Sequence, residues 1–254
     1  MTKFKAVFAT NIGLKRENNE DSLLVDDMIF NRTNMEVVCS HRFEKNKTIF
    51  SVADGIGGNQ GGEIASRIVL EHLRGYIIEK NDKKIEDLIK SSKIELENIS
   101  QNNERLSGLG TTVAGIAFDK EKIVVFNVGD SRVYKLSGKY LERLSKDHSV
   151  LEMLKDNGVT DKIENVPHNV ITSSISGDGI ENIPQIYVIE KGFEKGDTFL
   201  VCSDGLWDSI EIDVLEEGFQ KENLEETGKF LLEKALKNGG KDNITFIIVR
   251  CLDE

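Results

Sequence analysis

Three short apolar runs in this sequence each end at an aspartate that lies beside a glycine. The runs cover residues 49–53, 124–129 and 199–203. Apolar runs of this length, bounded by turn residues, are typical of buried β-strands. The aspartates that end these runs are Asp54, Asp130 and Asp204. Two further acidic residues, Glu20 and Asp21, follow the first strand-like segment, and Asp242 precedes the last one. Because neighbouring strands can bring their ends together, we expect these carboxylates to share one cleft.

Several carboxylates in one cleft repel each other, and burying them unpaired costs free energy. A bound divalent cation removes that cost. Carboxylate, carbonyl and water oxygens are ligands that suit Mg²⁺ or Mn²⁺. Asp-Gly is also ordinary turn chemistry, so any single pair can be explained as a turn. The whole set, in these strand contexts, predicts a metal site.

Periodicity predicts an antiparallel α+β fold. Helical spacing of apolar residues predicts helices within 64–77, 85–99 and 224–237, the last ending at Gly239-Gly240. The charged stretch 41–47 is expected to form a hairpin loop, and Asp147 to cap a short helix. Strand-like patterns are expected at 4–8, 23–25, 35–39, 48–53, 111–118, 123–128, 133–136, 140–144, 186–189, 198–202 and 244–251. Many strands with grouped helices favour antiparallel sheets packed against helices.

Composition excludes several classes of protein. The 254 residues carry a formal net charge of −11, which disfavours binding to nucleic acid. Cys39, Cys202 and Cys251 form no Cys-x-x-Cys pair, so neither a disulfide framework nor a structural zinc site is expected. No apolar run approaches the ~18 residues of a membrane span. The start of the chain lacks a signal-peptide core, so we expect a cytoplasmic protein with one domain over 1–254.

Seven sequence blocks occur in a characteristic order. They are Gly13-x-x-Arg16-x-x-Asn19-Glu20-Asp21-Ser22, Val52-Ala53-Asp54-Gly55-x-Gly57-Gly58, Gly110-Thr111-Thr112, Asn127-Val128-Gly129-Asp130-Ser131-Arg132, Asp147-His148-Ser149, Cys202-Ser203-Asp204-Gly205-Leu206-Trp207-Asp208 and Gly240-Lys241-Asp242-Asn243-Ile244-Thr245. With them the chain resembles, over almost its whole length, the metal-dependent type 2C serine/threonine protein phosphatases in their compact bacterial form. That resemblance implies a four-layer α-β-β-α sandwich, in which two packed antiparallel sheets are flanked by helix pairs.

The resemblance also implies the site and its cofactors, two Mn²⁺ or Mg²⁺ ions with a third in some members. Asp54 would bridge the two ions, and the Gly55 carbonyl would bind one of them. Asp204 and Asp242 would complete the other ion's ligands, and Asp130 with Asp204 would match a third site. Asp21 would act through a coordinated water, with Glu20 beside it.

A hydroxide activated by the two ions would attack phosphorus directly, with no covalent intermediate. Arg16 would hold the phosphate oxygens, because a guanidinium grips them bidentately. The implied partners are phosphorylated proteins, substrates of a serine/threonine protein kinase, and a monomer is expected. Trp207 is expected to serve only in packing, and Cys202 to be a buried small apolar residue.

The chain departs from the family pattern in two places. Ile56 stands where many eukaryotic relatives carry a histidine proposed as general acid, and residues 173–176 differ within a long irregular stretch, 157–183. Two alternatives therefore stay open: a catalytically silent regulatory module, and a hydrolase of small phosphoesters. The presence of Asp21, Asp54, Asp130, Asp204 and Asp242 favours an active enzyme over the silent module.

Overall fold

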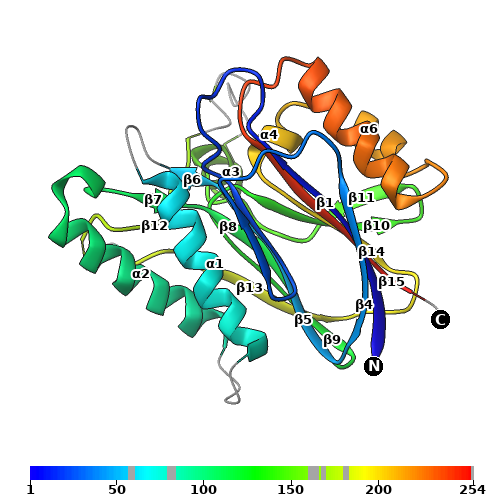
Figure 1. Cartoon of the computed structure of the whole chain (residues 1–254), viewed down its shortest axis with the longest axis horizontal. Helices are drawn as coiled ribbons and strands as arrows, with labels where there is room; N and C mark the ends of the chain where they lie inside the picture. The colour runs from blue at the N-terminus through cyan, green and yellow to red at the C-terminus, as the bar shows by residue number, and fades with distance from the viewer. Residues whose placement is uncertain (57–60, 79–83, 160–165, 167–169, 180–182, 253–254) are drawn as a thin grey trace.

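Two six-stranded antiparallel sheets pack face to face in the computed structural model of the protein (Figure 1). The structure describes residues 1–56, 61–78, 84–159, 166, 170–179 and 183–252. The first sheet has the spatial order β11 (Tyr140–Arg143), β10 (Arg132–Ser137), β14 (Thr198–Cys202), β15 (Ile244–Cys251), β1 (Thr2–Asn11), β4 (Cys39–Lys45). The second has the order β13 (Tyr187–Gly192), β9 (Lys122–Val128), β8 (Val113–Asp119), β5 (Lys47–Ala53), β2 (Ser22–Val25), β3 (Met28–Asn31). Three short strands form a small sheet, β12 (Ile175–Ser176), β7 (Gly110–Thr111) and β6 (Gly55–Ile56).

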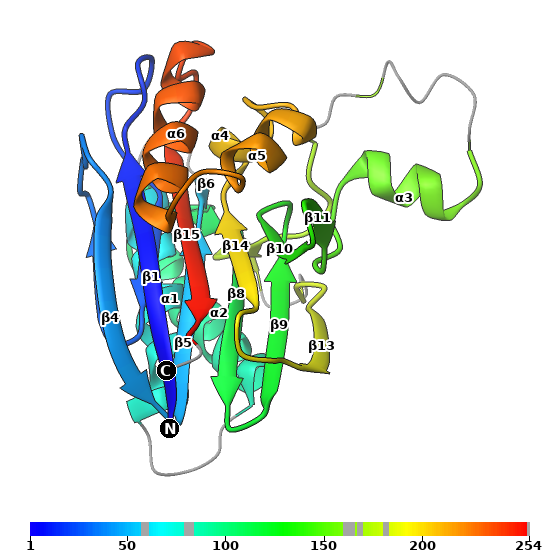
Figure 2. The same cartoon turned by 90° about the vertical axis from the view of Figure 1, so that its right-hand side faces the viewer.

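Helices cover the outer faces of both sheets. α1 (Gly62–Ile78) and α2 (Ile85–Asn102) pack on the second sheet, and the turn η1 (Glu104–Leu106) follows α2. On the first sheet lie α4 (Asp204–Trp207), α5 (Ile212–Gly218) and α6 (Leu224–Lys237). Figure 2 shows that α3 (Val150–Asp156) stands apart from the sandwich. The expected α+β, four-layer α-β-β-α sandwich is confirmed, with two short helices, α4 and α5, that periodicity did not predict.

The alternation of side chains along the strands builds the layers. In β1, Phe4, Ala6 and Phe8 point into the apolar cluster between the two sheets. The intervening Val7 and Ala9 belong to the cluster beneath α6. Successive side chains of a strand point to opposite faces, so one strand supplies two cores. This arrangement leaves the strand ends free to carry polar groups.

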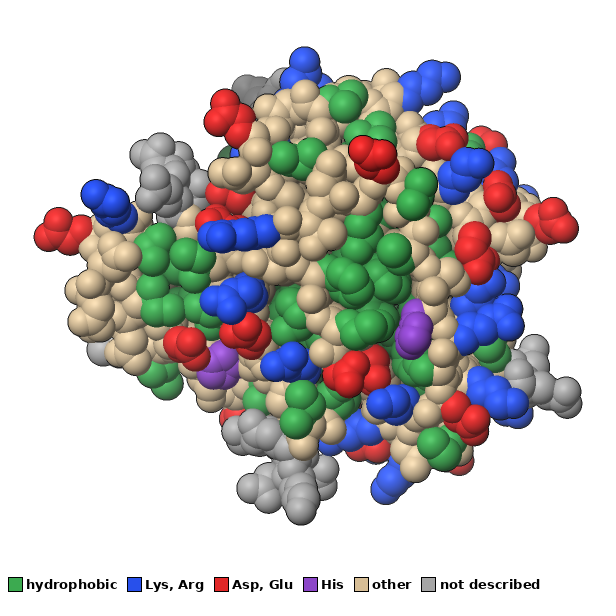
Figure 3. Space-filling view, in the orientation of Figure 1, with side chains coloured by type: hydrophobic (Ala, Val, Ile, Leu, Met, Phe, Trp, Pro, Cys, Tyr) green, Lys and Arg blue, Asp and Glu red, His purple; other side chains and the backbone are tan. Residues whose placement is uncertain are grey.

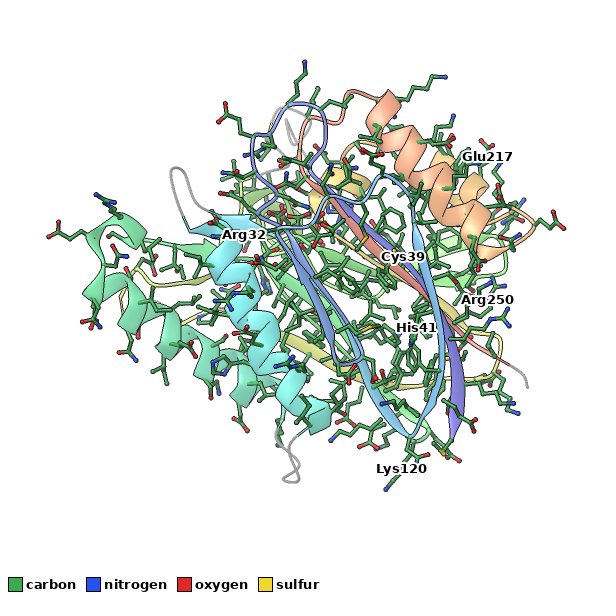
Figure 4. The ribbon with its side chains drawn as sticks, viewed as in Figure 1. Arg32, Cys39, His41, Lys120, Glu217 and Arg250 are labelled. Carbon is green, nitrogen blue, oxygen red and sulfur yellow. The ribbon has the colours of Figure 1, made fainter. Side chains whose placement is uncertain are left out.

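The stretch 41–47 was predicted wrongly. It is not a hairpin loop, because residues 39–45 form β4, paired with β1 at the edge of the first sheet. The predicted strand 35–39 is also wrong, since strand structure begins only at Cys39. An edge strand tolerates charged side chains because one of its sides and one of its faces meet solvent. Cys39 and His41 lie on this strand in Figure 4.

Apolar side chains gather near the middle of the face drawn in Figure 3. Met28, Phe30 and Phe43 are partly buried and pack against the core between the sheets. Phe43, on the otherwise polar β4, stacks on Phe4 with ring centroids 5.6 Å apart. The edge strand is therefore anchored through its inward side chain, which a search for continuous apolar runs does not detect.

The cap of α3 was also assigned to the wrong residue. Ser149, not Asp147, is the N-cap, and its hydroxyl accepts a hydrogen bond from the Glu152 N–H. Asp147 instead binds two arginines, Arg132 and Arg143. The end of α6 is as predicted, because Gly239 and Gly240 follow it with φ of 117° and 47°.

None of the helices in the described part of the chain combines the length and the apolar character that crossing a membrane requires.

Candidate active site

The strand registers bring the predicted acidic residues to one end of the sandwich. In the second sheet Ser22 pairs with Ala53, so the residues just outside that pair, Asp21 and Asp54, are neighbours. In the first sheet Cys202 of β14 pairs with Phe246 of β15, which places Asp204 and Asp242 at the corresponding end. The elements α4 and β6, which follow β14 and β5, lie toward the same upper end of the sandwich in Figures 1 and 2.

A cleft of about 310 Å³ opens at this end. Its lining includes seven of the eight predicted site residues, and the eighth, Asp21, is buried. The described lining residues are Arg16, Glu20, Asp54, Gly55, Ile56, Thr112, Asp130, Ile171, Asp204 and Asp242. A larger hollow of about 770 Å³ lies beside Met1 and Leu252, but Glu121 is the one acidic residue among the described residues that line it. The smaller cleft is therefore the candidate active site.

Asp21 lies at the junction of the two sheets. Its side chain is 1% exposed, and its Oδ2 accepts a hydrogen bond of 2.9 Å from the Ser203 hydroxyl, which belongs to the first sheet's end. Its Oδ1 is buried and has no hydrogen-bond partner among the described residues. Burial raises the pKa of Asp21 to about 8, with repulsion from Asp204 and Asp242 adding to the rise.

Three further carboxylates share this environment. Burial raises the pKa of Asp130 to about 7 and that of Asp204 to about 6, and it raises the pKa of Asp54 well above its usual range. Repulsion between neighbouring carboxylates is the next cause for each of them. Like that of Asp21, the Oδ1 of Asp204 is buried and has no hydrogen-bond partner in the part of the chain that the structure describes. The cluster thus holds two buried carboxylate oxygens whose capacity to accept a hydrogen bond or a cation is unused among the described residues.

These features fit divalent cations. A buried carboxylate oxygen without a partner is costly, and a hard cation with oxygen ligands would satisfy it. In the present side-chain arrangement, no three His, Cys, Asp or Glu side chains of the described residues converge on one point. Asp242 is not free to converge, because its Oδ1 accepts from the Asn243 N–H and its Oδ2 accepts from Arg16. The fit rests on the unpartnered oxygens of Asp21 and Asp204.

Arg16 lies at the rim of the cleft. Its side chain is 51% exposed, and its Nη2 is 2.6 Å from Asp242 Oδ2. The hydrogen bond to Asp242 raises the pKa of Arg16, and the charges of Asp54 and Glu20 act in the same direction. The predicted phosphate-binding residue therefore faces the acidic cluster and currently pairs with one of its members.

Gly55 and Glu20 meet where β6, α1 and the first loop come together. A Cβ at position 55 would lie 2.5 Å from the backbone of Gly62 and 2.7 Å from the Glu20 carbonyl oxygen, so only glycine fits there. The Ser66 hydroxyl donates to that same carbonyl oxygen. Burial raises the pKa of the Glu20 side chain, and the charge of Glu63 adds to the rise.

The comparison with known proteins assigns the family. The family model described as protein phosphatase 2C matches residues 37–244, which is more than half of the chain. The chain belongs to the protein phosphatase 2C family. The expected class of enzyme, a protein serine/threonine phosphatase, is confirmed, and so is the expected dependence on Mn²⁺ or Mg²⁺.

Relatives match the phosphatase over nearly its whole length. The serine/threonine phosphatase stp of Listeria monocytogenes is 29% identical over 256 residues, covering 96% of this chain and 94% of the relative. Protein phosphatase PhpP of Streptococcus pneumoniae is 30% identical, with 96% of both chains covered. The solved structure of PstP from Mycobacterium tuberculosis has a TM-score of 0.82 at 25% identity, covering 99% of this chain and all of that one. A second PstP structure, with a TM-score of 0.80, holds two manganese ions.

Sequence reasoning missed the residues that hold the phosphatase's acidic loop in place. The amide of Asn243 accepts from the Glu20 N–H and donates to the carbonyl oxygens of Ile12 and Asn18. It thereby fixes the loop that carries Arg16, Glu20 and Asp21 to the start of β15. The sequence block around Asn243 contained the signal, but only the aspartate next to it was assigned a role. Residues 57–60, 160–165, 167–169 and 180–182, which include two motif glycines and parts of the stretch 157–183, lie outside the described residues.

Proposed function

We propose that this phosphatase hydrolyses phosphoserine and phosphothreonine side chains of proteins by direct attack of water on phosphorus. The reaction consumes one water and releases inorganic phosphate and the free hydroxyl side chain, with no covalent enzyme intermediate. The observation that carries the proposal is the pair of buried, unpartnered oxygens, Asp21 Oδ1 and Asp204 Oδ1, within a cluster of carboxylates at one cleft.

Two divalent cations, Mn²⁺ or Mg²⁺, would be held by Asp54, the Gly55 carbonyl, Asp204 and Asp242, with Asp54 shared between them. When bound, these ions supply a water of lowered pKa and positive charge opposite the phosphate oxygens. Asp21, with Glu20 beside it, would accept hydrogen bonds from water that the ions hold in place. Asp130 and Asp204 would hold a third ion.

Arg16 would bind the phosphate oxygens of the substrate. Its position at the rim of the cleft, half exposed and close to Asp242, supports this role. A phosphate monoester carries two negative charges and offers the planar guanidinium two oxygens at once. Binding would exchange one anionic partner of Arg16, the carboxylate of Asp242, for another.

The described lining of the cleft supports direct attack by water. It contains neither cysteine nor serine, and the Thr112 hydroxyl is already hydrogen-bonded to that of Ser131. Cys202 is fully buried, and burial raises the pKa of its thiol, so it is not a nucleophile. Ile56 lines the cleft but cannot donate a proton, so water would protonate the leaving hydroxyl.

Residues 1–254 would act as one catalytic domain, because the strands that build the site come from both ends of the chain. We further propose a cytoplasmic monomer that reverses a serine/threonine protein kinase. The net charge of −11 gives no support to nucleic acid as a partner.

The test compares hydrolysis of para-nitrophenyl phosphate in Mn²⁺ and in EDTA, for the native chain and for Asp204→Ala. Asp27→Ala, at an exposed position outside the cleft, is the matched control. We expect activity that requires the cation, disappears in Asp204→Ala and persists in the control. A phosphothreonine peptide should be cleaved with a higher kcat/KM than a nucleoside monophosphate. The reverse preference would favour a small-phosphoester hydrolase, and a folded native chain with no activity would favour a silent module.

A further inference from the structure

The indole of Trp207 joins two segments that bear acidic residues of the site. Trp207 ends α4, the short helix that begins at Asp204 after β14 of the first sheet. Its Nε1 donates a hydrogen bond of 3.0 Å to the backbone carbonyl of Asp130, which follows β9 of the second sheet. Asp130 lies in the turn that leads from β9 of the second sheet into β10 of the first, so the indole connects this turn to α4, at the two residues that would share the third cation.

The indole is itself held in one orientation. The guanidinium of Arg132 lies over its ring, with the Cζ atom 3.3 Å from the ring centroid. Asp147 fixes this guanidinium through contacts of 3.0 Å to Nε and 2.7 Å to Nη2, and the Tyr134 hydroxyl accepts from Nη1 at 3.1 Å. Stacking and a charge-assisted pair on a half-buried side chain restrict the rotation of the ring.

The Asp130 turn is also fixed from its other side. Gly129 has φ of 94°, and a Cβ there would lie 2.6 Å from the Thr112 side chain. The Gly129 N–H donates to His148 Nδ1 at 3.1 Å, and the Gly129 carbonyl accepts from the His148 N–H at 2.8 Å. These contacts fix the turn with respect to residues 147–149. On the side of Asp204, β10 pairs with β14 up to Arg132 and Cys202, two residues short of Asp130 and Asp204. The indole hydrogen bond adds a link between the turn and the helix of Asp204 beyond the end of that ladder.

We propose that Trp207 is a positioning residue that sets the spacing of the Asp130 and Asp204 carboxylates and so defines the cation site between them. This inference rests on the proposed function. The two carboxylates repel each other while the site is empty of positive charge, and the ladder between β10 and β14 ends two residues short of each of them, so beyond it they could move apart. The hydrogen bond from the indole opposes that separation and keeps the pair ready for an ion. Packing alone, the role expected from the sequence, needs an aromatic ring but not its N–H group.

Trp207→Phe tests the N–H group directly, because it keeps a ring beneath Arg132 and removes the donor. Mn²⁺ binding is measured by isothermal titration and by the electron paramagnetic resonance signal of free Mn²⁺. We expect two tight ions per chain with unchanged affinity and a third bound at least about tenfold more weakly, which is the size of effect that residues supporting metal ligands commonly have. Tyr134→Phe is the matched control, since it removes a hydrogen bond from the same cluster without touching Asp130. Its three affinities should equal those of the native chain.

Activity gives a second readout. At limiting Mn²⁺, Trp207→Phe should hydrolyse para-nitrophenyl phosphate more slowly, and a high Mn²⁺ concentration should restore the native kcat. A packing defect would not be repaired by the ion. Equal binding of all three ions by Trp207→Phe and the native chain would overturn the inference, and so would a defect that added Mn²⁺ leaves unchanged.

The native chain provides a test that does not depend on the folding of a variant. Trp207 is its one tryptophan, and Mn²⁺ is a paramagnetic quencher, so its emission reports ions bound nearby. We expect the weakest binding step to quench the emission, and Asp130→Asn to abolish that step while leaving the tight ones. A third ion that binds without changing the emission would refute the inference. Should the native chain bind no Mn²⁺ at all, the proposed function fails as well, and the two failures are thereby told apart.

Discussion

Without bound cations, the phosphatase should become less stable as the pH rises. Asp21 is 1% exposed, and burial raises its pKa from the usual 3.8 to about 8. Between those values the folded chain binds more protons at this group than the unfolded chain does. The contribution of Asp21 to the free energy of unfolding is therefore fully present below pH 3.8, and it is lost as the pH rises through about 8. At about 1.4 kcal/mol per pH unit, the loss at pH 8 is on the order of 5 kcal/mol.

Asp21→Asn isolates this effect, because it keeps the size of the side chain and removes the charge. The amide oxygen can still accept from Ser203, but the new NH₂ group would occupy the position of the unpartnered Oδ1, at a cost of about 1–3 kcal/mol. In EDTA at pH 8 the variant should therefore be more stable than the native chain by roughly 2–4 kcal/mol. Near pH 5 the difference should vanish or change sign, since most of the native penalty is then absent.

The assay is urea unfolding followed by circular dichroism in EDTA at pH 5, 6.5 and 8. The quantity of interest is the difference in the free energy of unfolding between the native chain and Asp21→Asn, with Asp27→Asn as the exposed control. Saturating Mn²⁺ should reverse the order at pH 8, because the ions bind the folded native site. A metal-free native chain whose advantage over Asp21→Asn grows from pH 5 to pH 8 would refute the reasoning.

Three further changes have expected outcomes. Arg16→Lys should raise KM for para-nitrophenyl phosphate by roughly tenfold with a smaller effect on kcat, because a point charge replaces a bidentate group; an unchanged KM in steady-state assays would exclude the phosphate role. Gly205→Ala should lower the free energy of unfolding by about 3 kcal/mol or more, because a Cβ there would overlap the backbone carbonyl oxygen of Asn243. A Cβ at position 192 meets free space, so Gly192→Ala should change stability little. Equal melting temperatures for the two variants would contradict this. Lys93→Met should cost roughly 3–5 kcal/mol in urea unfolding because it leaves the buried Glu97 without its cation, and adding Glu97→Leu should recover much of the loss; a double variant no better than the single one would refute this explanation.

The sequence was most informative where one interaction dominated locally. The bounds of α6 followed from apolar spacing and from two glycines with positive φ, because a helix end is fixed by residues a few positions away. β4 was missed because its stability comes from pairing with β1 and from the packing of Phe43 against Phe4 and Phe50, which a continuous apolar run does not signal. The cap of α3 was misassigned because Asp147 and Ser149 suit a cap equally well. Asp147 is instead held by Arg132 and Arg143, which leaves Ser149 as the cap.

The membership of the candidate site was predictable, but its connections were not. Short motifs at strand ends identified the acidic residues, and the sheet registers bring them to one end. The pairing of Arg16 with Asp242 and the bond from Trp207 to Asp130 join residues 226 and 77 positions apart. Such distances depend on how the two sheets are stacked, and no local pattern encodes that.

The candidate site gathers residues 16, 20, 21, 54, 55, 130, 204 and 242, which lie just beyond the ends of strands that pair early segments with late ones. β1 and β15, which hold the two ends of the chain side by side, must meet before Asn243 can fix the loop of Asp21. A topology so rich in non-local pairing folds slowly, because the loss of chain entropy precedes most of the stabilising contacts. During synthesis, the site therefore cannot form until the last strand has left the ribosome. A chain that ends before residue 242 would lack the Asp242 side chain and the support of Asn243, so such a copy would have no means of removing phosphate from proteins.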